Sequence, residues 1–190
     1  GGYKSVTISK SPIGKTFSNV SAGGFSMTDT SGLLGDFVAW CLDISAYLGT
    51  SGVHNYETTT TPFSNSYGID QSRIQNVFDA NFSDDLLTDK DKAAAFQLTL
   101  WEATYDDDFD LTTGGFQGSA NATILGYANG FLTAAEGYVG NKRMNLTFLE
   151  STGDPHRQNL VTATPVPLPA AGLMLLGALG GMVGLRRRKR

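Results

Sequence analysis

The sequence contains few of the side chains that usually carry metal or redox chemistry. Cys41 is the only cysteine, and His54 and His156 are the only histidines. An internal disulfide and a three-histidine zinc site are therefore excluded. The chain also lacks a Gly-x-Ser-x-Gly motif and a phosphate-binding loop, the signatures of common hydrolase and nucleotide sites. We predict no cofactor, no metal ion and no multiple-turnover enzymatic activity.

Two weaker patterns are set aside on physical grounds. Asp106, Asp108 and Asp110 alternate as in a calcium loop, but Leu111 and Gln117 stand where an EF-hand needs glycine and a bidentate glutamate. We interpret the segment as a solvated acidic turn. A cysteine-protease dyad of Cys41 with a histidine is disfavoured, because the cysteine lies in an apolar run that predicts a buried strand.

Basic residues are scarce outside the last five positions. The chain has 14 lysines and arginines, of which five are the terminal run Arg186, Arg187, Arg188, Lys189 and Arg190. The rest of the chain therefore carries 9 basic residues against its 18 acidic ones. An acidic body repels phosphate, so we predict no nucleic-acid partner. A length of 190 residues with 23 glycines and only 17% charged residues favours one β-rich extracellular domain.

The end of the chain differs in composition from the rest. Prolines interrupt residues 164–169, and the next 16 residues, 170–185, carry no charge. A helix of that length spans about 24 Å, less than the roughly 30 Å hydrocarbon core. Its basic end should stay cytoplasmic, which leaves the body outside. A permanent anchor and a buried core helix are the alternatives; the core helix is disfavoured because five basic residues follow it.

The same segment resembles the PEP-CTERM class of sorting tails. The resemblance rests on the motif Val166, Pro167, Leu168, Pro169 and Ala170, followed by the apolar and basic stretches. It implies that an exosortase, a membrane protease of Gram-negative bacteria, removes the tail. We therefore expect an exported precursor held transiently at the inner membrane and then a cell-surface or matrix protein, with a domain over residues 1–163 and a sorting tail over 164–190. No signal peptide is visible before Gly1, which indicates a processed start or a fragment.

Hydrophobic periodicity predicts an α+β domain with a central buried helix pair. The expected helices are 72–82, 92–105 and a weaker one over 122–136 that is interrupted at Gly126 and Gly130. Residues 92–105 are apolar nearly all round, so that helix should be buried, and Thr88 with Asp91 should cap its start. The expected strands are 3–9, 16–20, 25–28, 37–42, 145–149 and 159–163, with a loop and at most a short hairpin over 49–68.

Cys41 and Gln97 are the two residues whose position needs an explanation. Cys41 lies in the run Trp40-Cys41-Leu42-Asp43 of a strand expected to be buried on both faces. Gln97 lies in the middle of the buried helix, where an unpaired amide costs a few kcal/mol. In the simpler interpretation Gln97 hydrogen-bonds a loop carbonyl and Cys41 is a small core residue.

These two segments also resemble the signature segments of bacterial surface thioester domains. The resemblance rests on Trp40 to Asp43 and on Phe96-Gln97-Leu98-Thr99-Leu100-Trp101-Glu102, in that order along the chain. It implies an internal thioester between Cys41 and Gln97 that couples once to an amine on a partner. Such a site must be dry. The residues expected to support it are Trp40, Phe96 and Trp101 by excluding water, and Asp43 and Glu102 by moving protons. Either carboxylate could equally be a solvated charge or a cap. The alternative is a non-covalent component of a biofilm matrix.

Overall fold

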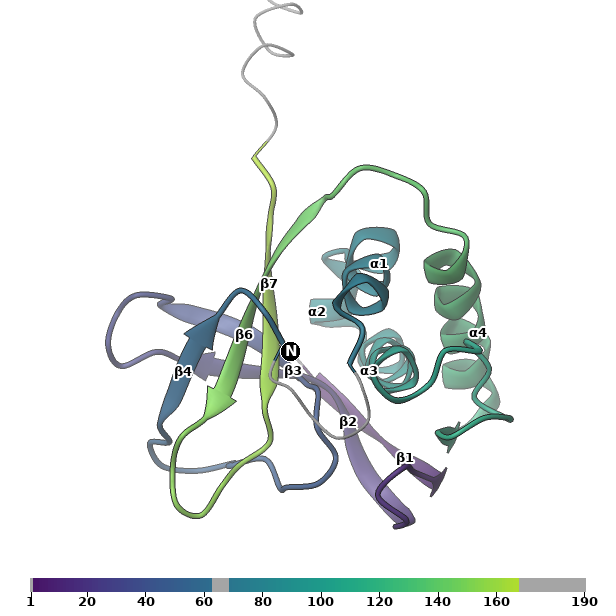
Figure 1. Ribbon diagram of the computed structural model, residues 1–190, viewed down its shortest axis with the longest axis horizontal. Coiled ribbons are helices and arrows are strands. Elements are labelled where there is room, and N and C mark those ends of the chain that lie inside the picture. The colour runs from purple at the N-terminus through teal and green to yellow at the C-terminus, as the bar shows by residue number, and fades with distance from the viewer. Residues whose placement is uncertain (1, 63–68, 168–190) are drawn as a thin grey trace, which may run out of the picture.

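The computed structural model describes residues 2–62 and 69–167 (Figure 1). In chain order, its elements are β1 (Gly2–Lys10), β2 (Phe17–Thr28), β3 (Asp36–Cys41), β4 (Tyr56–Thr59), α1 (Gln71–Asn81), α2 (Asp85–Thr88), α3 (Lys90–Tyr105), β5 (Gln117–Ser119), α4 (Ala122–Glu136), β6 (Met144–Ser151) and β7 (Leu160–Pro165). The α+β class expected from the sequence is confirmed.

The strands form one seven-stranded sheet in the order β4-β6-β7-β3-β2-β1-β5. Every neighbouring pair is antiparallel. The helices gather on one side of this sheet, where α1, α3 and α4 pack against one another (Figure 1). The last of the described strands, β7, lies between β6 and β3, so the segment that follows the helices is paired directly with the strand that carries Cys41.

The observed strands differ from the predicted ones in three places. The two segments predicted at 16–20 and 25–28 form one strand, β2, because its glycine-containing middle pairs with β1. Gly23 permits that pairing: its φ is +152°, and a Cβ there would lie 2.1 Å from the carbonyl oxygen of Gly2. The loop interpretation of 49–68 was wrong for β4, which pairs with β6, and β5 was not predicted.

Three predicted helices are confirmed, and one short helix, α2, was not predicted. The prediction of two buried central helices is confirmed for only one of them. Helix α3 is buried at every residue from Ala93 to Tyr105, whereas α1 is buried on one side only. Helix α4 continues through Gly126 and Gly130. The predicted cap was wrong. Thr88 ends α2, and Asp89 caps α3 by accepting hydrogen bonds from the N–H groups of Asp91 and Lys92 at 2.8 and 3.1 Å.

The corrected cap can be tested by a pair of adjacent substitutions. Asp89→Ala removes the acceptor of two helix N–H groups and should lower the free energy of unfolding by about 1 kcal/mol. Thr88→Ala changes an exposed side chain at the end of α2 and should alter that free energy by less than about 0.5 kcal/mol. Denaturant unfolding measures both. A larger loss from Thr88→Ala than from Asp89→Ala would restore Thr88 as the cap.

Two clusters of buried side chains form the core, and α3 belongs to both. Ala94, Leu98 and Trp101 of α3 pack in the cluster that contains Cys41. Phe96 and Leu100 pack in the other cluster, which contains Trp40. Adjacent residues of β3, Trp40 and Cys41, therefore belong to different clusters, and the same is true of adjacent residues of α3. The contact between β3 and α3 consequently lies where the two clusters meet.

The chain stays in the sheet slightly beyond the boundary expected at residue 163. Thr164 and Pro165 belong to β7, and the N–H of Val166 donates to the carbonyl of Arg143 at 2.8 Å. The remainder of the predicted sorting motif, Leu168 to Ala170, and the basic run Arg186 to Arg190 lie outside the described residues. Within residues 2–62 and 69–167, no helix is long and apolar enough to span a bilayer.

Candidate functional site

Cys41 is the last residue of β3 and is almost completely buried. On one side it pairs with Leu160 of β7, and the next N–H, of Leu42, donates to the carbonyl of Asn159 at 2.9 Å. On the other side the pairing between β2 and β3 ends at Phe25 and Ala39. The main-chain N–H and carbonyl of Cys41 therefore need a partner that β2 does not supply.

Gln97 of α3 supplies that partner. Its side-chain Oε1 accepts a hydrogen bond from the Cys41 N–H at 2.9 Å, and its Nε2 donates to the Cys41 carbonyl at 2.7 Å. The amide is fully buried and replaces the missing strand in the hydrogen-bonding ladder. The structure thus brings together the two residues singled out from the sequence and satisfies the amide without a loop carbonyl.

The Cys41 thiol is free, and its environment opposes ionisation. Burial raises the pKa of this thiol far above its usual range, and the negative charge of Asp43 raises it further. The thiol is therefore protonated at neutral pH. Any reaction at the sulfur must remove its proton as the new bond forms, because a pre-formed thiolate is not populated.

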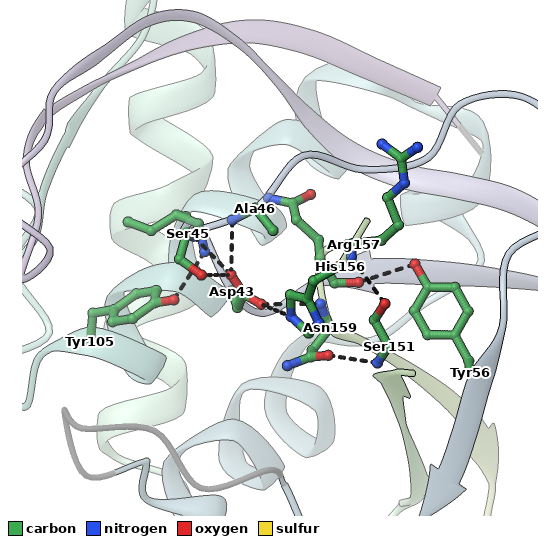
Figure 2. Close-up of polar contacts among 11 residues, drawn as sticks. Asp43, Ser45, Ala46, Tyr56, Tyr105, Ser151, His156, Arg157 and Asn159 are labelled. Atoms are coloured by element: carbon green, nitrogen blue, oxygen red, sulfur yellow. Dashed lines mark hydrogen bonds and ion pairs between the residues drawn. The ribbon is translucent and has the colours of Figure 1, made fainter. Parts of the chain in front are cut away.

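Asp43 organises the backbone that follows Cys41 (Figure 2). Its Oδ1 accepts from the N–H and the hydroxyl of Ser45 at 2.8 and 2.7 Å, and from the N–H of Ala46 at 3.3 Å. Its Oδ2 accepts from the N–H of Asn159 at 3.3 Å. A carboxylate with these partners is a cap that ties the turn after β3 to the segment before β7. Of the three roles considered from the sequence, proton transfer, a solvated charge and a cap, the structure supports the cap.

Three further polar side chains surround this segment that the sequence did not single out (Figure 2). His156 Nε2 lies 3.9 Å from Asp43 Oδ2 and is half exposed. Tyr105 accepts a hydrogen bond from the N–H of Ile44 at 3.0 Å. Tyr56 donates to the carbonyl of Gln158 at 3.1 Å. Burial raises the pKa of Tyr56 to about 12, and the charge that Cys41 carries when ionised is the next cause.

The three aromatic residues singled out from the sequence lie in the core that surrounds the pair. Trp40, Phe96 and Trp101 are all fully buried. The ring of Trp40 meets that of Phe96 edge-on, with centroids 4.7 Å apart. Trp101 packs in the cluster that contains Cys41. These buried rings make the interior on this side of the sheet apolar.

Glu102 has different neighbours from those expected. It is fully buried, but its carboxylate is grouped with those of Asp106 and Asp108 at the end of α3. A helix turns by about 100° per residue, so Glu102, five residues after Gln97, lies about 140° around the helix from it. The structure therefore assigns the flanking position beside Cys41 to Asp43 alone.

The surface near the pair is hollowed in two places. A groove of about 1110 Å³ has Tyr56, His54 and Phe37 among its lining residues, with several threonines of β4 and its flanks. A smaller hollow of about 530 Å³ includes Gln158 in its wall. Neither wall includes Cys41 or Gln97. The contact between Tyr56 and Gln158 joins the walls of these two hollows.

Comparison with known proteins yields only structural likeness. No family model matches the chain, and no curated protein matches it. The N-terminal thioester domain of a surface protein from Clostridium perfringens, solved as a cysteine-to-alanine mutant, has 12% identity and a TM-score of 0.51, covering 74% of this chain and 88% of that one. This likeness shows a thioester-domain-like fold, and at 12% identity it shows the fold alone.

Two further solved structures are similar at lower TM-scores. An N-terminal thioester domain of a Clostridium perfringens surface protein has 12% identity and a TM-score of 0.48, covering 85% of this chain and 99% of that one. The N-terminal domain of the Streptococcus pyogenes pilus tip adhesin Cpa has 13% identity and a TM-score of 0.43, covering 76% and 93% respectively.

Proposed function

We propose that this chain is an exported surface adhesion domain that couples covalently to amines through a thioester between Cys41 and Gln97. The observation that carries the proposal is the pair of hydrogen bonds by which the buried Gln97 amide holds the main chain of Cys41. They hold the amide against the main chain of the residue that carries the only thiol of the protein. The shared fold with a thioester domain supports the same conclusion.

The chemistry follows from this geometry. The Cys41 sulfur attacks Gln97 Cδ, and the charge that develops on Oε1 is stabilised by the Cys41 N–H, which already donates to that oxygen at 2.9 Å. The thiol proton passes to Nε2, the C–N bond breaks and ammonia leaves. A partner amine then attacks the same carbon, the C–S bond breaks and the sulfur takes a proton. Each chain reacts once, so the protein is a reagent and not an enzyme.

An incoming amine must reach a buried carbon. The walls of the two surface hollows meet where Tyr56 donates to Gln158, in the segment before β7, the strand that pairs with Cys41. We propose that the amine approaches through the larger groove and displaces this hydroxyl. The partner would be an amine-bearing surface or matrix molecule, such as a protein with an accessible lysine.

The proposal includes the predicted sorting tail. It rests on the motif beginning at Val166 and on the basic run that ends at Arg190. An exosortase-type membrane protease would remove this tail after the precursor has been held at the inner membrane. The body would then remain at the cell surface or in the matrix, where a reactive acyl group can meet amines of other molecules.

Intact mass spectrometry of the full chain tests the thioester. We expect the native protein to be one ammonia lighter than its sequence, and Cys41→Ala to show no such deficit. Methylamine should add one equivalent at Gln97 and release a thiol that labels in denaturant. The same measurement on protein recovered from its own cells shows whether the tail has been removed.

A full sequence mass, with a thiol that labels at once in denaturant, would contradict the thioester. It would favour the second candidate, a non-covalent matrix component. One observation supports that candidate: both hydrogen-bonding groups of the Gln97 amide are already satisfied by the main chain of Cys41. In that case Gln97 serves only to complete the sheet.

A further inference from the structure

The end of α3 and the loop after it bring three carboxylates together. Glu102 lies in the last turn of α3, Asp106 follows the helix directly, and Asp108 lies in the loop. One oxygen from each lies within 4.8 Å of the others. Two of these residues belong to the acidic run noted in the sequence, but the third comes from the helix, which no loop motif would reveal.

Glu102 is the residue that requires a ligand. Its side chain is fully buried, and neither carboxylate oxygen has a hydrogen-bond donor. Burial, together with the adjoining carboxyl groups of Asp108 and Asp106, raises the pKa of Glu102 to about 9. A buried carboxylate without a donor is costly and needs either a proton or a cation.

The two aspartates are held in place by the loop itself. Asp106 Oδ2 accepts from the N–H groups of Gly115 and Phe116, the latter at 2.9 Å. Asp108 accepts from the N–H of Asp110 at 3.0 Å and from the hydroxyl of Thr113 at 2.7 Å. Burial acts to raise the pKa of Asp108, but these hydrogen bonds outweigh it and hold that pKa below its ordinary value. Asp106 Oδ2 is fully used by its two donors, but Asp106 Oδ1, which accepts from the N–H of Asp107 at 2.9 Å, keeps a lone pair for another partner, as do the two oxygens of Asp108.

The surrounding charges favour a cation. The three groups lie at the C-terminal, negative end of the α3 dipole, and the last turn of α3 contains no basic residue. Among the described residues, no ion pair involves Glu102, Asp106 or Asp108. The nearby basic side chains are engaged with main-chain carbonyls: Lys10 donates to that of Gly114, and Arg73 to that of Ala103.

We propose that Glu102, Asp106 and Asp108 bind one calcium ion. All three ligands are carboxylates, which hard divalent cations prefer, and two of them stand on an irregular loop that suits the variable coordination of calcium better than the strict octahedron of magnesium. The site differs from an EF-hand, because Asp110 turns away to accept from the N–H and hydroxyl of Thr112 at 2.9 and 2.7 Å. The ion would fasten the loop to the end of α3.

Thermal unfolding of the full chain tests the calcium site. Calcium at about 100 times its dissociation constant should raise the Tm by about 5–10 °C over a sample in EDTA. Glu102→Gln should remove this shift. Asp107→Asn is the matched control, since Asp107 is an exposed acid of the same loop outside the three, and it should keep the full shift. Magnesium at the same concentration should give a much smaller shift.

Terbium luminescence provides a second measurement. Trp101 and Tyr105 lie in the same helix turn as Glu102 and should sensitise terbium bound there. Calcium should quench that emission, and Asp108→Asn should abolish it. Because the site is separate from the Cys41–Gln97 pair, both results should be unchanged in Cys41→Ala, which separates this proposal from the thioester.

Three outcomes would overturn the proposal. The first is the absence of any calcium shift in the parent protein together with a Glu102→Gln variant that is at least as stable in EDTA, since that result means that Glu102 carries a proton. The second is a loss of the calcium-induced Tm shift in Asp107→Asn as large as that in Glu102→Gln, which would mean that calcium responds to the total negative charge of the loop and not to a specific site. The third is an equal response to magnesium.

Discussion

In a Cys41→Ala background, Gln97→Glu is expected to leave the domain folded at pH 4 and to lower its free energy of unfolding by about 3–4 kcal/mol at pH 7. The alanine background is used because neither chain can then form a thioester. A protonated carboxyl group at position 97 could still accept from the N–H of residue 41 and donate to its carbonyl, as the amide does. The ionised form loses the donor and places a charge in a fully buried site.

The direction of the pH dependence follows from this difference. Burial and a facing carbonyl raise the pKa of the introduced carboxyl group in the folded state above its unfolded value of about 4.3. The protonated carboxyl group therefore makes its full contribution to the free energy of unfolding below about pH 4. That contribution falls by about 1.4 kcal/mol per pH unit as the pH rises toward the folded-state pKa. Buried glutamates with pKa values of about 8–9 are known, so the loss should still be growing at pH 7.

Urea unfolding at several pH values, with and without Gln97→Glu, isolates the effect, because other titrating groups cancel in the difference. Gln75→Glu is the matched control: Gln75 also donates to a main-chain carbonyl, that of Met144 at 2.9 Å, but it is only partly buried. It should show a loss of less than about 1.5 kcal/mol with little pH dependence. A Gln97→Glu penalty that is equal at pH 4 and pH 7 would show that the amide is not locked to residue 41.

Local patterns predicted the long, periodic elements of the fold and missed the short ones. The buried helix and the strand of Cys41 have continuous apolar runs, which give a strong signal. Strand β4 is four residues of mixed polarity, and its partner β6 lies about 90 residues later, so only the tertiary pairing defines it. Asp89 was missed as a cap because Thr88 and Asp91 have the spacing of a capping box.

The candidate site was predictable where a physical problem was visible in the sequence. A buried amide needs partners, and this requirement singled out Gln97 before its contact with Cys41 was seen. His156 and Tyr56 carry no such signal, because they reach the site through loops and an edge strand. Glu102 was predicted beside Cys41 from its proximity in sequence to Gln97, although helical geometry turns it to another side of α3.

Phe96→Ala is expected to destabilise the domain by about 3–5 kcal/mol. The Phe96 ring is fully buried and touches rings from three elements: Trp40 of β3 at 4.7 Å between centroids, Phe78 of α1 at 5.1 Å, and Phe131 of α4 at 6.4 Å. Removing it opens a cavity at the point where these elements meet and also removes the edge-to-face contacts, each worth about 0.5–1.5 kcal/mol.

The control for this prediction is Phe131→Ala. Phe131 also contacts two rings, that of Phe96 edge-on and that of Tyr127 by stacking, but it is only partly buried. Its removal lets solvent and neighbouring side chains fill the space, so the loss should be about 1–2 kcal/mol. Denaturant unfolding of both variants gives the comparison, and equal losses would contradict the assignment of Phe96 as the residue that joins the three elements.

Phe96→Leu then separates volume from ring geometry. Leucine keeps most of the buried apolar surface, so this variant should lose no more than about 1.5 kcal/mol.

Phe96 precedes Gln97 in α3, and Trp40 precedes Cys41 in β3, so the contact between the two rings runs alongside the contact between the amide and the strand. If the rings set the spacing of α3 from β3, Phe96→Ala should also reduce the ammonia deficit in the intact mass, whereas Phe131→Ala should leave it unchanged. Full retention of the deficit in a folded Phe96→Ala variant would show that the two hydrogen bonds of Gln97 alone hold the thiol and the amide together.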